Sequence, residues 1–118
     1  DSKACKFANI ADGNNWNDTF PCDDGARFIQ SVGTYKANPF GIYDILGNVV
    51  EWTCSKYDKN YQGNELKCIA SIDDKDLVSI RGGSFVNEPD LVRTPNRVSG
   101  EAWKRGDDRG FRLAKSYK

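Results

Sequence analysis

Residues 38–52, "NPFGIYDILGNVVEW", hold the densest set of structural signals in this chain. The stretch opens on a turn signal, has a Gly47-Asn48 corner in its middle, and ends in a short apolar run. Asp44 and Glu51 lie on either side of the corner. A corner of this kind can bring two carboxylates and several carbonyls toward one point, which is the oxygen set that calcium prefers.

Spacing alone favours a simpler interpretation of this corner. In that interpretation Asp44 bonds its own backbone in the turn, and Glu51 lies solvated on a strand. The same question arises for the long loop between "ANIAD" at 8–12 and "DDG" at 23–25, where Asn9 and Asp24 offer side-chain oxygens. The loop lacks the DxDxDG ladder of an EF-hand, so its pattern is weak in isolation.

Composition excludes several classes of protein. The chain has 118 residues, the size of one small domain, with 17 basic and 17 acidic side chains, so no overall field favours nucleic acid. No apolar run approaches the ~20 residues of a membrane span. Histidine is absent, which removes the commonest general base and zinc ligand. Methionine is absent too, and residues 1–5 do not resemble a signal peptide, so we expect a processed or excised chain.

The four cysteines are Cys5, Cys22, Cys54 and Cys68, and their spacings match no CxxC pattern. Three disulfide pairings are open, and the local one, Cys5–Cys22 with Cys54–Cys68, closes two modest loops. Polar, loop-like flanks favour disulfides over free thiols. Disulfides indicate an oxidising compartment, so we expect an extracytoplasmic location: secreted, periplasmic or at the cell surface.

Periodicity predicts an α+β, loop-rich fold with short strands and little helix. No twelve-residue window keeps an apolar helical stripe. We expect strands within residues 27–35, 49–54, 77–85 and 109–114, with a bulge at Gly82-Gly83. Residues 11–26 and 55–76 are expected to be long loops.

Taken in order, the segments "ANIAD…DDG…SVGTYKANPFGIYDILGNVVEW…SIRGGSF…LVRTPNR…RGFRLAKS" resemble the formylglycine-generating enzyme (sulfatase-modifying factor) family. The resemblance implies a C-type-lectin-like fold with short antiparallel strands. It runs from about Ala8 to Ala114 and covers only the C-terminal half of a typical family domain. Residues 1–118 are therefore expected to form a single domain or the C-terminal half of one, completed by a missing segment, by a second chain or not at all.

The resemblance also implies two calcium sites. In enzyme-like members each site has two side-chain ligands and two backbone carbonyl ligands. The first set corresponds here to Asn9, Ile10, Asp24 and Ala26, and the second to Asp44, Gly47, Val49 and Glu51. The side-chain ligands would be Asn9 and Asp24 in the first set and Asp44 and Glu51 in the second. This sequence therefore keeps a side chain with an oxygen at all four side-chain positions.

Catalysis is not carried over by the resemblance. The family's oxidase holds copper with two cysteines after its GGS motif, and the corresponding residues here are Asn87 and Val92. Neither offers the thiolate that Cu(I) requires. Ser84 remains from the active-site region, but no histidine is present to act as its base.

Other family members bind ligands through the residues between RGGS and GFR, which correspond to residues 86–108 here. We expect a candidate ligand face formed by Asn87, Glu88, Asp90, Trp103, Lys104, Arg105 and Asp107. An aromatic ring among charges suits a binding surface. The alternative is that Trp103 folds back onto a small core.

Two functions follow as expectations. The first is a non-catalytic, calcium-stabilised, C-type-lectin-like module that binds a protein or glycan ligand or assembles with another subunit. The alternative is the C-terminal part of a family oxidase whose catalytic groups lie in a missing N-terminal region. Neither nucleic-acid binding nor a membrane span is expected.

Overall fold

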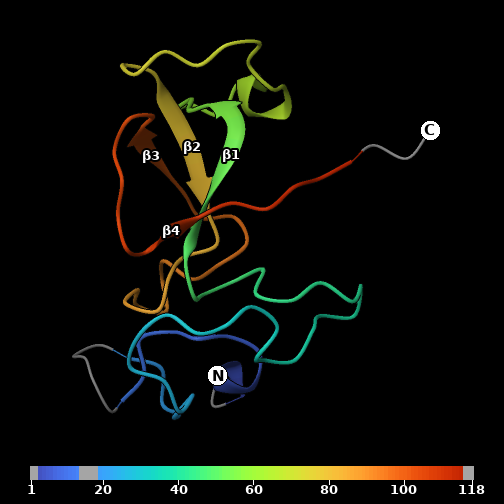
Figure 1. Cartoon of the computed structure of the whole chain (residues 1–118), viewed down its shortest axis with the longest axis vertical. Coiled ribbons are helices and arrows are strands. Elements are labelled where there is room, and N and C mark those ends of the chain that lie inside the picture. The colour runs from blue at the N-terminus through green and yellow to red at the C-terminus, as the bar shows by residue number, and fades with distance from the viewer. Residues whose placement is uncertain (1–2, 14–18, 116–118) are drawn as a thin grey trace.

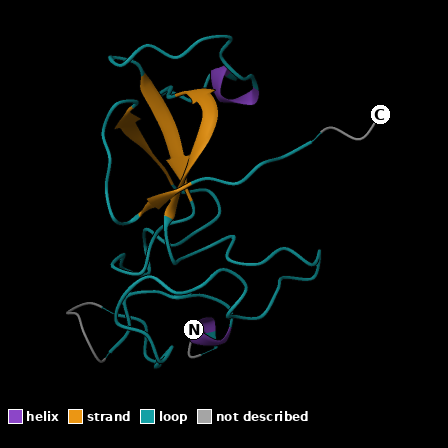
Figure 2. Ribbon diagram, viewed as in Figure 1, coloured by secondary structure: helices purple, strands orange, loops and turns teal. Residues whose placement is uncertain are grey.

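The computed structural model describes residues 3–13 and 19–115 (Figure 1). Turns and irregular loops form most of this part of the chain, as Figure 2 shows. The regular elements are η1 (Ala4–Lys6), β1 (Val50–Lys56), η2 (Asn64–Leu66), β2 (Leu77–Arg81), β3 (Arg97–Glu101) and β4 (Arg109–Gly110). The loop-rich α+β prediction with little helix is therefore confirmed.

The four strands form one sheet in the order β3-β2-β1-β4. It occupies the upper part of the molecule in Figure 1, and the N-terminal loops lie below it. Strands β1 and β2 pair antiparallel, with Trp52 opposite Ile80 and a bulge between Trp52 and Lys56. Strand β4 pairs parallel to β1, which differs from the expected all-antiparallel arrangement. Strand β4 has only two residues and is therefore much shorter than the strand predicted within residues 109–114.

The prediction of a strand within residues 27–35 is wrong, because this segment forms an irregular loop. The backbone there bonds to side chains instead of to another strand: the Phe28 carbonyl accepts from Asn9, and both backbone groups of Gln30 bond to the Asn48 side chain. Gly33 has a φ of +77°, a left-handed conformation that ends any extended run. The segment is thus held in place as an irregular loop.

Strand β3 was not predicted, because its residues are mostly polar and include Gly100. It is an edge strand, and all five of its residues pair antiparallel with β2. Gly100 is required by packing: a Cβ there would lie 2.8 Å from the Trp52 ring. Arg97 of β3 makes cation–π contacts with two tyrosines, its guanidinium carbon lying 5.1 Å from the centre of the Tyr57 ring and 4.8 Å from that of Tyr61.

The local disulfide pairing, Cys5–Cys22 and Cys54–Cys68, is the one that forms, and no free cysteine remains. The first disulfide closes the loop predicted for residues 11–26, of which 14–18 lie outside the described residues. It belongs to the main buried apolar cluster, whose members are Cys5, Ala8, Ile10, Phe20 and Val92. This small core lies under the segments that carry the predicted metal ligands.

Candidate functional site

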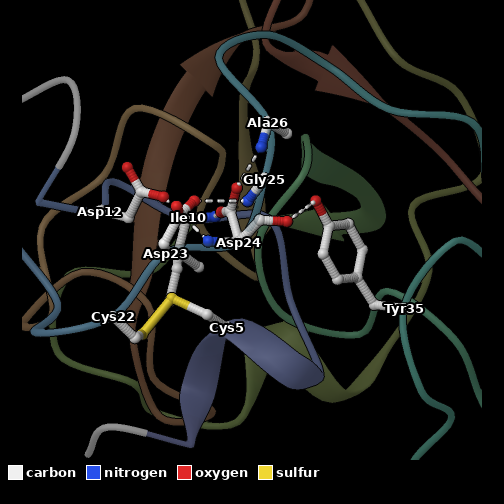
Figure 3. The surroundings of a disulfide bond; sticks show 9 residues. All are labelled: Cys5, Ile10, Asp12, Cys22, Asp23, Asp24, Gly25, Ala26 and Tyr35. Carbon is white, nitrogen blue, oxygen red and sulfur yellow. Dashed lines mark hydrogen bonds between the residues drawn. A yellow bond between two sulfur atoms is a disulfide. The ribbon is translucent and has the colours of Figure 1, made fainter.

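The first predicted metal corner is assembled around Asp24 (Figure 3). One carboxylate oxygen accepts the Ile10 N–H at 2.7 Å, and the other accepts the Ala26 N–H at 2.8 Å. The structure therefore brings together three of the four residues predicted for this corner. In this arrangement the N–H groups of Ile10 and Ala26 face the carboxylate. A carboxylate has about four lone-pair sites, so each oxygen can still accept a further ligand.

Asp12 is a member of this corner that sequence analysis missed. It is 1% exposed, and its Oδ2 accepts the Asp24 N–H at 2.9 Å. Burial raises the pKa of Asp24, and the charges of Asp12 and Asp23 raise it further, against the lowering effect of the hydrogen bonds from Ile10 and Ala26. A cation beside Asp24 would offset this concentration of negative charge. The signal available in the sequence was the acid at the end of "ANIAD", opposite "DDG".

Asn9, the fourth residue of the first corner, is 1% exposed and turns toward the second corner. Its Nδ2 donates to the Phe28 carbonyl at 2.9 Å and to Asn48 Oδ1 at 3.1 Å. The two predicted corners are thus neighbours in space and are joined through buried amides.

The second predicted corner is formed by residues that line one open cavity of about 780 Å³, among them Asp44, Gly47, Val49 and Glu51. Asp44 has a positive φ of 51°, and its Oδ2 accepts the Gly33 N–H at 2.7 Å. Its Oδ1 is buried and has no hydrogen-bond partner among the described residues. A buried, unpartnered carboxylate oxygen is what a bound cation would satisfy.

Arg112 already holds the other acid of this corner. Its guanidinium bonds both carboxylate oxygens of Glu51 and also donates to the carbonyls of Tyr43 and Asp44, at 2.9 and 2.8 Å. The hydrogen bond to Glu51 raises the pKa of Arg112, so the arginine stays charged. Glu51 is therefore paired, and the interpretation that it lies solvated on a strand is wrong. A cation at this corner would share Glu51 with Arg112.

The donor chemistry of both corners fits calcium. Among residues 3–13 and 19–115, no group of three or more Asp, Glu, His or Cys side chains is arranged to hold a metal. The prediction gave each corner two side-chain ligands, and Asn9 is turned away from the first corner. A cation at either corner would therefore depend on backbone carbonyls and water, as calcium commonly does. The unpartnered oxygen of Asp44 and the crowded acids around Asp24 favour such a cation. Two bound calcium ions stay a prediction.

The positions of the family's copper cysteines are closed by structural contacts. Asn87 Oδ1 accepts from the Ser84 N–H at 2.9 Å and from the Ser84 hydroxyl at 3.1 Å, so Ser84 is bonded within its own turn. Val92 is 7% exposed and packs on Gly83, where a Cβ would lie 2.9 Å from its Cγ2. Ser84 itself is fully buried. The Ser84 hydroxyl and the Asn87 amide are therefore bonded to each other inside the turn.

The structure divides the candidate ligand face between two places. Glu88 and Asp90 lie at one open hollow with Thr19. Trp103, Lys104 and Arg105 line another hollow, on the turn that follows β3. Asn87 belongs to neither, because its amide closes the Ser84 turn, and Asp107 is exposed near the second hollow in sequence. Trp103 is 60% exposed, so it does not fold back onto the core.

Residues 2–117 match the family model of the sulfatase-modifying factor enzyme 1-like domain. The chain belongs to this family. Bovine inactive C-alpha-formylglycine-generating enzyme 2 is 29% identical over 111 residues, which are 86% of this chain and 33% of that protein. The formylglycine-generating enzyme of Mycobacterium tuberculosis is 29% identical over 89 residues, 65% of this chain and 30% of that protein. The family thus includes both inactive and active relatives.

Two solved structures share the fold of this family member. PvdO from Pseudomonas aeruginosa superposes with a TM-score of 0.68 and 31% identity, over 91% of this chain and 38% of that one. Treponema denticola variable protein 1 superposes with a TM-score of 0.67 and 25% sequence identity, over 92% of this chain and 36% of that one. The predicted fold and family are therefore confirmed. The chain spans about a third of the length of the relatives it matches.

The described residues contain no helix long and apolar enough to cross a bilayer. The two disulfides are compatible with an extracytoplasmic location.

Proposed function

We propose that this chain is a non-catalytic, calcium-stabilised module that binds a protein or glycan ligand through residues 86–108. The observation that carries the proposal is the state of the two copper positions. Asn87 is bonded to Ser84, and Val92 is packed into the core. Both side chains stabilise the turn that corresponds to the copper site of the resembled enzymes. Neither side chain contains a sulfur that could bind copper.

The relatives support this proposal in part. Cattle and mouse proteins named inactive C-alpha-formylglycine-generating enzyme 2 are 29% identical to the chain. The active Mycobacterium enzyme is equally similar, so membership of the family does not decide between the functions. The substitutions at residues 87 and 92 are what favour the non-catalytic role over the oxidase interpretation.

The calcium part of the proposal is supported by the two corners. A cation bound only by the folded state would stabilise the chain by mass action, about 2.7 kcal/mol at a hundredfold excess over the dissociation constant. Such a gain is useful to a chain whose described core contains only nine buried apolar residues. Oxygen ligands on irregular loops also suit calcium, whose geometry is flexible.

Two measurements on the purified chain test the proposal. The first follows thermal unfolding in calcium and in excess chelator. In the second, a cysteine-containing peptide is incubated with the chain, copper and air, and formylglycine is measured by mass spectrometry. We expect the chelator to lower the melting temperature and no formylglycine to form. Formylglycine would overturn the non-catalytic role, and an unchanged melting temperature would overturn the calcium role.

A second candidate function is assembly with another polypeptide, which a specific surface favours. Around the 780 Å³ cavity, Val32 is 88% exposed, Tyr43 49% and Phe111 73%. In Figure 1 the loop containing residues 32–43 and the segment after β4 both extend to the right of the body. Exposed apolar patches of this kind mark interaction sites. The occupant that fits is a polypeptide equivalent to the two thirds of the bovine relative's length that this chain does not span.

The assembly proposal predicts that the isolated chain binds an apolar fluorescent dye at this surface. The variant Val32→Lys with Phe111→Lys is expected to lose most of that binding while it keeps both disulfides and its melting temperature. Leu66→Lys with Ile72→Lys is the control, because these residues are also exposed but lie in the loop before β2. No dye binding, or equal loss in the control, would contradict the proposed surface. A stable dimer of defined mass would instead identify a second copy as the occupant.

A further inference from the structure

The turn between β3 and β4 holds a hollow of about 560 Å³ that we name the Trp103 pocket. Its main lining residues are Trp52, Asp74, Trp103, Lys104, Arg105 and Arg109. Three are cations and one is an acid, in a chain whose total charge is zero. Cations therefore outnumber acids by three to one in this lining, and Asp107 and Asp108 follow it directly in the sequence.

Arg109 supplies a charge that is fixed in position at the base of this pocket. Its guanidinium lies 5.4 Å from the centre of the Trp52 ring, a cation–π contact. Two glycines make room for it: a Cβ at Gly106 would lie 3.2 Å from Arg109 Nε, and one at Gly100 would lie 3.3 Å from Nη1. The backbone and the indole together hold the arginine in one place.

The charge of Arg109 is incompletely neutralised. Asp108 Oδ1 lies 3.7 Å from Arg109 Nε, which is within ion-pair range but is too long for a hydrogen bond. Arg109 Nε and Nη1 are buried and have no hydrogen-bond partner among the described residues. The side chain is 19% exposed, so its outer part can still face a ligand. In a partly desolvated position, this charge attracts an anion more strongly than a charge in water does.

Trp103 provides the apolar part of the surface. Its side chain is 60% exposed, on a turn closed by the hydrogen bond from the Lys104 N–H to the Glu101 carbonyl at 2.9 Å. Tryptophan and arginine are the residue types that most often dominate protein–protein binding energy. An exposed indole beside cations is thus suited to a polypeptide that carries carboxylates.

We infer that the Trp103 pocket binds an acidic peptide segment, with Asp or Glu carboxylates at Lys104, Arg105 and Arg109 and an apolar side chain on Trp103. This inference rests on the proposed ligand-binding function, and it names the ligand chemistry and adds Trp52 and Arg109 to the site. Charge complementarity steers association and selects the partner. At the exposed Arg105, a bidentate carboxylate contact adds geometric selection.

The experiment uses a hexaglutamate peptide as the probe, with tryptophan fluorescence and calorimetry as readouts. Binding is expected at low salt and is expected to weaken as the ionic strength rises, because the charges are screened. Trp103→Ala and the pair Lys104→Glu with Arg105→Glu are each expected to weaken binding at least about tenfold, as hot-spot changes do. All of these residues are exposed, and unchanged circular dichroism and disulfide content would show that the variants fold.

The matched control is the pair Arg27→Glu with Lys36→Glu, which makes the same change of charge in the N-terminal loops. Equal loss of binding in this control would overturn the inference, since total charge would then explain the result. Absence of hexaglutamate binding, or binding of sialyllactose alone, would also overturn it. If chelator still lowers the melting temperature in that case, the calcium-stabilised module survives, and only the identity of the ligand changes.

Discussion

Asn48 and Asn9 are bonded to each other twice. The Asn48 N–H donates to the Asn9 carbonyl at 2.7 Å, and Asn48 Oδ1 accepts from Asn9 Nδ2 at 3.1 Å. The pair is buried and joins segments 39 residues apart in the sequence. Each asparagine belongs to a segment predicted to bind one calcium, so the geometry of one corner depends on the other.

We expect Asn48→Ala to destabilise the chain by about 3 kcal/mol, since hydrogen bonds contribute about 1 kcal/mol each and a non-glycine residue at positive φ costs about 1–2. Asn48 has a φ of 62°, and its side chain also bonds both backbone groups of Gln30. Urea unfolding measures the loss. Asn48→Gly is the matched variant, because it removes the same hydrogen bonds without the strain and should lose less. Equal losses would show that strain is not involved.

The Arg112–Glu51 pair fixes the segment after β4 to the second corner. We expect Arg112→Lys to lose about 2 kcal/mol of unfolding free energy, because hydrogen bonds to charged groups are worth about 1.5–3 kcal/mol and lysine cannot bond Glu51 and two carbonyls together. Arg93→Lys is the control, since Arg93 makes a single bond to the Asp90 carbonyl on the surface. A loss no greater than in the control would mean that the corner is stable without the guanidinium.

Glu65 should make stability depend on pH in the acid range. Its side chain is 2% exposed, and burial alone would raise its pKa. Hydrogen bonds from Asp58 and Ser79, together with the charges of Arg97 and Arg81, outweigh burial, so the pKa of Glu65 lies below its ordinary value of 4.5. The stabilisation is therefore present above pH 4.5 and is lost as the pH falls through the lowered value.

The variant Glu65→Gln tests this dependence. We expect it to lose about 3 kcal/mol near pH 7, the lower end for a broken buried ion pair, since both arginines are partly exposed. The difference from the wild type should shrink below pH 4.5. Unfolding free energies measured from pH 7 to 3 give the comparison. A difference that stays constant over this range would show that the Glu65 charge is not responsible.

The two disulfides should differ in their ease of reduction. Cys5 is 6% exposed and lies in the core, whereas Cys54 and Cys68 are both exposed. Thiol exchange requires access to the sulfur, so mild reductant should open Cys54–Cys68 first. Mass spectrometry after alkylation identifies the opened pair. Removing Cys54–Cys68 by a double serine substitution should cost about 3 kcal/mol, the value for a loop of this length. Earlier opening of Cys5–Cys22 would contradict the burial argument.

Asp44→Ala is expected to remove one calcium site. It should lower the melting temperature in calcium and have a smaller effect in chelator, where the bond to the Gly33 N–H is lost and alanine adds strain at a positive φ. Calorimetric titration should show one calcium fewer than in the wild type. The control Asp90→Ala changes an exposed acid outside both corners. An equal loss with and without chelator would mean that Asp44 acts only through its hydrogen bond.

Local chemistry explains what could be predicted from the sequence. The Gly47-Asn48 corner, the glycines after β2 and the short apolar runs of β1 and β2 depend on backbone preferences of neighbouring residues. Residue identity alone also showed that Asn87 and Val92, at the positions that the resemblance matches to the copper cysteines, have no sulfur. The ordered motifs were specific enough to indicate the family and the fold.

Other features depend on partners that are distant in the sequence. Glu51 and Arg112 are 61 residues apart, and no spacing rule relates them. Strand β3 has no alternating apolar pattern and exists because β2 offers it an edge. Residues 27–35 have the composition of a strand, but the side chains of Asn9 and Asn48 take their backbone groups.

The family, the turns and the lack of sulfur at residues 87 and 92 could be read from the sequence, because they depend on which residues are present and on their near neighbours. Three contacts needed long-range packing: Arg112 binds Glu51, Asp12 accepts from Asp24, and Arg109 lies over the Trp52 ring. Those contacts arise when packing brings distant segments together, and buried polar groups must then find partners where the fold places them.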